Sequence, residues 1–114
     1  MRMISIGALA TLATSSVAED MLSLTGDALV TTLTNAQVYY DNAHRQFFYE
    51  DGLTEYSSGS QPSLGNWRIQ NDQYCSQWPP QKDWDCYEVR RSADGSRIVF
   101  IGDHSDEYPG TLKK

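Results

Sequence analysis

Long apolar runs are missing from this 114-residue chain after its first eighteen residues, so no later segment offers the roughly 20 apolar residues of a membrane-spanning helix. Basic residues are also scarce. Lys and Arg number 9 against 15 Asp and Glu, which gives a net charge of −6 at pH 7. Such a negative field repels phosphate groups. We therefore expect an acidic protein with no membrane insertion and no nucleic-acid partner.

Recognisable catalytic and cofactor motifs are missing as well. The sequence contains no G-x-S-x-G nucleophile motif and no G-x-G-x-x-G dinucleotide motif. We expect no cofactor, because no arrangement of reactive side chains in the sequence dictates a particular chemistry.

The first eighteen residues, MRMISIGALATLATSSVA, resemble a secretory signal peptide. They combine a cationic start at Arg2, an apolar stretch and a small-residue end at Ser16-Val17-Ala18. We expect cleavage between Ala18 and Glu19. The remaining residues, 19–114, should form a single β-rich domain in the periplasm or outside the cell.

Cys75 and Cys86 are the only cysteines of the chain. An even pair in a short exported chain predicts a disulfide. The alternative is a redox or metal-binding pair. Against it, the spacing is not C-x-x-C and the nearest histidine in the sequence is His104.

Helix signals surround residues 25–33. Thr25 is a suitable N-cap and Asn35 a suitable end. Leu29, Val30 and Leu33 are spaced to share one face, so we expect this helix to pack on a sheet.

From Ala36 onward the apolar pattern changes to period two, broken by turn dipeptides that are typical of antiparallel hairpins. The predicted fold is mainly β (α+β), a curled antiparallel meander or partial barrel with the helix packed on it. The charged residues after Gly102 are expected to be irregular surface. Seven strands are predicted, at about 36–40, 45–50, 53–58, 64–70, 73–78, 84–91 and 97–102.

Turn chemistry also predicts the register of each hairpin. A two-residue turn at Asp51-Gly52 would place Phe47 and Tyr49 on the core face and Phe48 on the opposite face. A turn at Asn71-Asp72 sets Ile69 opposite Tyr74.

Two further hairpins follow. Counting outward from the loop 79–82 sets Cys75 opposite Cys86, although a slightly displaced register would relieve strain in the bridge. The last hairpin is ambiguous. A two-residue turn at Asp94-Gly95 puts Ile98 and Phe100 on the side of Val89, whereas a three-residue loop puts Val99 and Ile101 there.

A set of motifs gives the chain a likeness to a known group. They are Leu24-Thr25-Gly26, Asp51-Gly52, Gly65-x-Trp67, Cys75 and Cys86-Tyr87. In this pattern the chain resembles a family of small secreted proteobacterial proteins of unknown function. The resemblance implies a secreted, disulfide-linked β domain and carries over no active residue. Some similar proteins are labelled dihydrodipicolinate reductase, a label that neither a dinucleotide motif nor a βαβ unit supports here.

Aromatic residues suggest a binding function. Trp78 and Trp84 lie in the segment 75–86, with Trp78 at a Pro-Pro loop and with Arg68 and Arg90 expected beside Trp84. Exposed rings next to hydrogen-bonding side chains suit protein or sugar surfaces, so we expect a binding or interaction module whose partner is a protein or a saccharide. The alternative interpretation is that the helix covers these rings.

Two further hypotheses concern catalysis and metal binding. A small hydrolase-like enzyme would use His44 or His104 as a general base together with nearby carboxylates. Asp103, His104, Asp106 and Glu107 could hold a divalent cation, although they lack the ligand alternation of an EF-hand loop. In both cases the alternative is a solvated surface turn.

Overall fold

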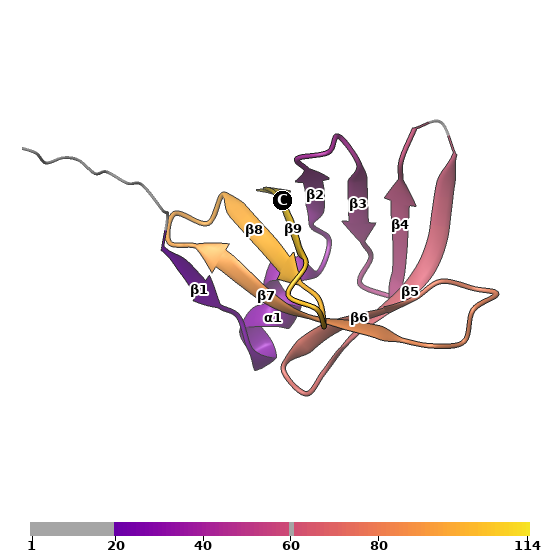
Figure 1. Ribbon diagram of the computed structural model, residues 1–114, viewed down its shortest axis with the longest axis horizontal. Coiled ribbons are helices and arrows are strands. Elements are labelled where there is room, and N and C mark those ends of the chain that lie inside the picture. The colour runs from indigo at the N-terminus through magenta and orange to yellow at the C-terminus, as the bar shows by residue number, and fades with distance from the viewer. Residues whose placement is uncertain (1–19, 60) are drawn as a thin grey trace, which may run out of the picture.

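The computed structural model describes residues 20–59 and 61–114, in which nine antiparallel strands and one helix are formed (Figure 1). The elements follow one another in this order: β1 (Met21–Ser23), α1 (Gly26–Leu33), β2 (Gln37–Tyr40), β3 (Arg45–Phe48), β4 (Leu53–Ser57), β5 (Pro62–Gln70), β6 (Gln73–Gln77), β7 (Asp85–Ser92), β8 (Arg97–Ile101) and β9 (Glu107–Lys113).

Strands β2 to β9 close into an eight-stranded antiparallel barrel. The strand order is β1-β7-β6-β5-β4-β3-β2-β9-β8, and β8 also pairs with β7 through Val89↔Phe100 and neighbouring positions. Strand β7 therefore pairs with β6 by its first half and with β1 by its last three residues, so β1 is an addition outside the closed ring. An eight-stranded barrel has an interior that either fills with side chains or holds one small ligand.

Closure of the barrel corrects the prediction of a partial barrel with seven strands. All seven predicted strands are present, but residues 107–113 are strand β9 and not irregular surface. Strand β9 pairs with β8 on one side and β2 on the other. Gly110 permits this close approach, since a Cβ added there would lie 2.8 Å from the carbonyl oxygen of Tyr39 and 2.9 Å from Cγ1 of Val38.

The hairpin between β3 and β4 has a different register from the predicted one. Phe48 pairs with Thr54, and the Tyr49 N–H donates to the carbonyl of Leu53, so the loop has three residues and not two. Gly52 supplies its left-handed position with φ of 94°. Phe48 is consequently buried at 0% exposure, and the prediction that Phe47 and Tyr49 face the core was wrong.

The other registers agree with the turn chemistry. Asn71 and Asp72 both have positive φ, as a two-residue type I′ turn requires, and Ile69 pairs with Tyr74. In the last hairpin Val89 pairs with Phe100, so the alternative with Ile98 and Phe100 facing inward is the observed one.

The predicted disulfide is formed. Cys75 pairs directly with Cys86 in the register of β6 and β7, with a Cα–Cα distance of 4.0 Å. A structural disulfide indicates an oxidising compartment. The predicted signal peptide, residues 1–18, lies outside the described residues. Among the described residues, no helix combines the length and the apolar character needed to cross a membrane.

Helix α1 closes one end of the barrel. It spans Gly26–Leu33 and packs Leu29 and Leu33 into the core. Val30 is 44% exposed, so the prediction that it shares their face was wrong. The Thr25 side chain makes no capping hydrogen bond. Instead, the Gly26 N–H donates to Oδ1 of Asp72 at 2.9 Å, which fixes the start of the helix to the turn between β5 and β6.

The core lies between this helix and the middle of the barrel. It combines aliphatic side chains with the rings of Phe48, Trp67, Tyr74 and Phe100. Its buried members are Leu29, Leu33, Ala36, Val38, Phe48, Trp67, Tyr74, Val89, Ile98, Phe100 and Leu112. These core side chains do not fill the interior at the opposite end of the barrel.

Candidate functional site

A cavity of about 660 Å³ occupies the end of the barrel opposite α1. All eight strands of the closed ring, β2 to β9, contribute residues to its walls, mainly from the strand ends and turns that meet there. Pockets of 300–1,000 Å³ in barrel mouths are common ligand sites. The lining residues are Tyr40, Asp41, Asn42, Gln46, Tyr56, Ser63, Leu64, Tyr74, Ser76, Trp78, Pro79, Tyr87, Phe100, Glu107, Tyr108 and Pro109.

Seven aromatic rings of this lining form one continuous series of contacts. Adjacent ring centroids in the series lie 5.2–6.1 Å apart, within the range of favourable aromatic pairs. The cavity wall is therefore a connected aromatic surface. In order of contact the rings are Trp78, Tyr56, Tyr40, Phe100, Tyr74, Tyr87 and Tyr108.

The polar groups at the inner end of the cavity bond to one another. Gln46, only 4% exposed, accepts a hydrogen bond of 2.6 Å from the Tyr40 hydroxyl. Its amide nitrogen donates to Thr54 Oγ1 and to the Tyr74 hydroxyl, each at 2.9 Å. Because a buried polar group without a partner is costly, this network explains how a glutamine is tolerated in the barrel interior.

The phenols of the cavity resist ionisation. Burial raises the pKa of Tyr40, Tyr56 and Tyr74 above the ordinary value for tyrosine. Burial also raises the pKa of Tyr87, and the charges of nearby aspartates raise it further. A hydrogen bond of 2.5 Å to Asp106 raises the pKa of Tyr108 to about 12. The hydroxyls are consequently neutral near pH 7.

This shift predicts a loss of stability in alkali. Unfolded tyrosines ionise near pH 10, whereas Tyr40 and Tyr74 stay protonated in the fold, so the unfolded state loses protons first. The contribution of the two buried phenols to the free energy of unfolding is complete below about pH 10. It is lost as the pH rises from there towards their raised pKa values. We expect the free energy of unfolding in urea to fall between about pH 9 and 11, and Tyr74→Phe to reduce that slope. A free energy that is constant or rises over this range would contradict the burial of these phenols.

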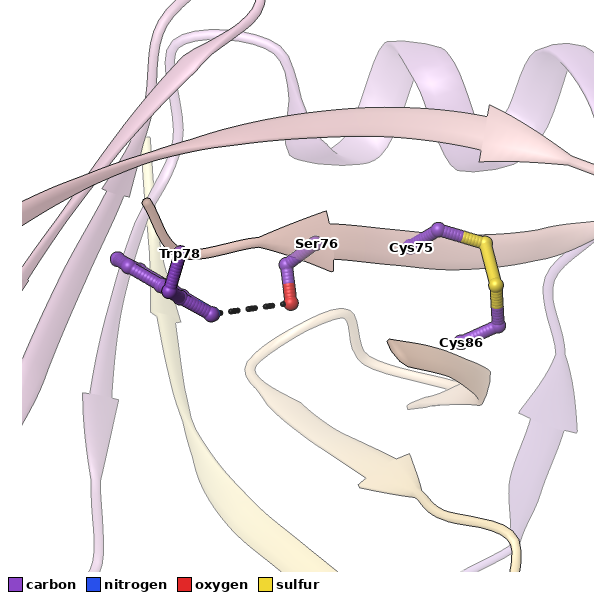
Figure 2. The surroundings of a disulfide bond; sticks show 4 residues. All are labelled: Cys75, Ser76, Trp78 and Cys86. Carbon is purple, nitrogen blue, oxygen red and sulfur yellow. Dashed lines mark hydrogen bonds between the residues drawn. A yellow bond between two sulfur atoms is a disulfide. The ribbon is translucent and has the colours of Figure 1, made fainter. Parts of the chain in front are cut away.

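Trp78 forms part of the cavity wall because Gly65 leaves room for it. A Cβ at position 65 would lie 2.6 Å from the carbonyl oxygen of Gln77 and 2.6 Å from Cε3 of Trp78. The Trp78 indole N–H donates to Ser76 Oγ at 3.2 Å, as Figure 2 shows. The ring also meets Tyr56 edge to face.

We expect Gly65→Ala to be destabilising. The added methyl group must displace backbone or the indole ring, and overpacking of this kind costs about 1–3 kcal/mol of unfolding free energy. Thermal unfolding with a shift in Trp fluorescence measures both effects. An unchanged melting temperature would show that Trp78 does not lie against Gly65.

The structure does not bring the four residues that the sequence suggested for binding into one site. Trp78 lines the cavity. Arg68 and Trp84 meet on the outer face, where the guanidinium carbon lies 3.9 Å from the ring centroid. Arg90 is exposed on β7 and forms an ion pair of 2.8 Å with Glu88.

The disulfide does not reach the cavity. Cys75 and Ser76 are neighbours on β6, so their side chains point to opposite faces of the sheet (Figure 2). Ser76 lines the cavity and Cys75 faces outward with Arg68, its partner in the register.

His44 lies behind the cavity wall, in contact with Tyr56, and His104 lies on the surface. His44 is half-buried, and its Nδ1 lies within hydrogen-bond distance of the Tyr56 hydroxyl at 2.7 Å. Burial raises the pKa of Tyr56, so this contact does not produce a phenolate near neutral pH. His104 is exposed in the turn between β8 and β9. Neither imidazole is among the described residues that line the cavity.

The acidic turn does not form a metal centre in residues 20–59 and 61–114, where no three His, Cys, Asp or Glu side chains are grouped to share an ion. Asp106 instead accepts the Tyr108 hydroxyl. Asp103, His104 and Glu107 are exposed around it.

Sequence reasoning missed most of the cavity. Gln46 carried a signal, since it alternates with the buried Phe48 on β3 and its amide needs partners inside the fold. Tyr108 had no signal, because it lies in the segment that was expected to be irregular.

Comparison with known proteins adds no relative: no protein-family model, curated protein or solved structure matches the chain significantly. The resemblance to small secreted proteobacterial proteins stays a prediction.

Proposed function

We propose that this protein is a binding module that holds a small, largely apolar organic molecule in the open end of its barrel. The observation that carries this proposal is the 660 Å³ cavity with its continuous wall of seven aromatic rings. Such a wall offers a ligand a large apolar area, and the fixed barrel lowers the entropic cost of ordering the site.

This proposal keeps part of the segment 75–86 as a binding element. Trp78 contributes to the cavity wall, whereas Trp84 lies on the outer face against Arg68. A saccharide needs many hydrogen-bonding groups. The amide of Gln46 already bonds to Tyr40, Thr54 and Tyr74, which favours a less polar ligand.

The compartment is part of the same proposal. The disulfide requires an oxidising environment, and residues 1–18 have the pattern of a signal peptide. We infer that the protein acts in the periplasm or outside the cell. A hydrolase based on His44 or His104 has no comparable support, since neither imidazole lines the cavity.

Titration with the neutral dye N-phenyl-1-naphthylamine, followed by its fluorescence, tests the proposal. We expect saturable binding that Trp78→Ala weakens about tenfold, because the ring is part of the wall. Trp84→Ala is the matched control and should bind like the parent protein. Absence of saturable binding, or a loss with Trp84→Ala alone, would contradict the cavity as the binding site.

A further inference from the structure

The charged residues that line the cavity are both acidic. Asp41 and Glu107 are the charged lining residues, and no Lys, Arg or His lines the cavity in the part of the chain that the structure describes. Arg97 lies close by, with its guanidinium bound to both carboxylate oxygens of Asp41 at 2.7 and 3.0 Å. Arg97 and Asp41 therefore balance each other.

Further carboxylates surround the mouth beside Tyr87. Asp85 pairs with Ser76 in the register, so it lies on the cavity side of β7 at its exposed start. Asp103 and Asp106 belong to the turn between β8 and β9. Burial raises the pKa of Tyr87, and the charges of these three aspartates raise it further, as expected for carboxylates near this ring.

The inner end of the cavity offers little to an anion. Gln46 uses its carbonyl for Tyr40 and its amide nitrogen for Thr54 and Tyr74. The indole N–H of Trp78 is likewise used by Ser76. An anion at this inner end would lose its hydration without gaining a charge-assisted hydrogen bond from these two side chains, which is strongly unfavourable.

Aromatic rings recognise positive charge without hydrogen bonds. The face of a Trp or Tyr ring attracts an ammonium group through its quadrupole, and a series of such rings is the usual way to bind quaternary ammonium compounds. The cavity combines this surface with carboxylates at its mouth, which raise the local concentration of cations.

We propose that the cavity selects organic cations, in which an ammonium group is joined to an apolar body of ring size. This inference rests on the proposed function and adds the charge of the ligand to it. The apolar body contacts the aromatic wall, and the cationic head lies near Tyr87 and Tyr108 at the acidic side of the mouth.

Three probes of the same shape test the charge directly. Benzyltrimethylammonium, neopentylbenzene and phenylmethanesulfonate share a benzyl group and a tetrahedral head, with charges of about +1, 0 and −1 respectively. Their affinities are measured by displacement of N-phenyl-1-naphthylamine at low salt. We expect the cation to bind about 3- to 30-fold more tightly than the neutral probe, and the anion to bind most weakly.

Two double variants distinguish the effect of the aspartates at the mouth from the effect of the cavity itself. Asp85→Asn with Asp103→Asn should reduce the preference for the cation and leave the affinity for the neutral probe unchanged. Asp20→Asn with Asp27→Asn changes the net charge equally at exposed positions outside the lining and should leave the preference intact.

The outcomes distinguish the two claims. Equal or tighter binding of the neutral probe or of the anion overturns the selection for cations and leaves a small-molecule site in place. Failure of all three probes and of the dye to bind overturns the proposed function itself. A cation preference that persists in the mouth variant but is lost in the control variant also overturns the inference.

Discussion

Replacing Phe48 with alanine is expected to lower the free energy of unfolding by about 3–5 kcal/mol, a large part of the stability of a domain of this size. The ring is fully buried at the centre of the barrel. It contacts Trp67, Tyr74 and Phe100 with centroid distances of 5.7, 5.5 and 6.1 Å. Its removal leaves a cavity that these rigid rings cannot fill, and urea denaturation followed by circular dichroism measures the loss.

Phe47→Ala is the matched control, since it deletes the same side chain one residue earlier. Phe47 is half-buried on the outer face, where its ring centroid lies 4.5 Å from the ring centroid of Tyr49. We expect a loss of about 1 kcal/mol or less. The opposite order, with Phe47→Ala the more damaging change, would mean that the hairpin has the two-residue turn and that the register is shifted by one.

Removal of the disulfide is the second large effect. The bridge closes a loop between positions separated by 11 residues, which stabilises the fold by about 3 kcal/mol through the reduced entropy of the unfolded chain. We expect Cys75→Ala with Cys86→Ala to lose roughly this amount in urea denaturation. The folded barrel should persist, because β6 and β7 keep their other pairs.

Reduction of the unmodified protein provides the control for packing. It opens the bridge and retains both sulfur atoms, so a similar loss in the reduced protein and in the double alanine variant assigns the effect to the cross-link. Equal stability of the oxidised and reduced protein would contradict a stabilising bridge. Dye binding should change little at equal folded fraction, since Cys75 faces away from the cavity.

Local turn chemistry accounts for the hairpins that the sequence predicted correctly. Asn71 and Asp72 tolerate positive φ at two successive positions, which leaves one register for β5 and β6. Asp51-Gly52 is less informative, because Gly52 fits a two-residue turn and also the left-handed position of a three-residue loop. The difference of one residue exchanged the faces of Phe47 and Phe48.

Barrel closure could not be predicted from local patterns. Strand β9 contains Pro109 and Gly110, which are unfavourable in strands, and its partners β2 and β8 are distant or ambiguous in the sequence. Tertiary pairing decides its conformation. The prediction of irregular surface after Gly102 agreed with the local propensities of these residues. It was nevertheless wrong, because pairing with β2 and β8 makes residues 107–113 a strand.

The candidate site depends on that closure. Tyr108 lies on β9, which pairs with β2 beside Tyr40 and with β8 opposite Phe100, so this part of the cavity wall exists only when β9 completes the ring. Trp78 was selected for its place in the disulfide-linked segment. Its contact with the cavity follows from its position two residues after Ser76, which also lines the cavity.

The most direct test of a ligand site inside the barrel is an NMR measurement of intermolecular nuclear Overhauser effects from bound N-phenyl-1-naphthylamine. The structure predicts effects between the dye and the ring protons of Tyr56, Trp78 and Tyr87, which line the cavity. Effects confined to Trp84 or Tyr39, whose rings lie on the outer face, would place binding outside the barrel and contradict the account.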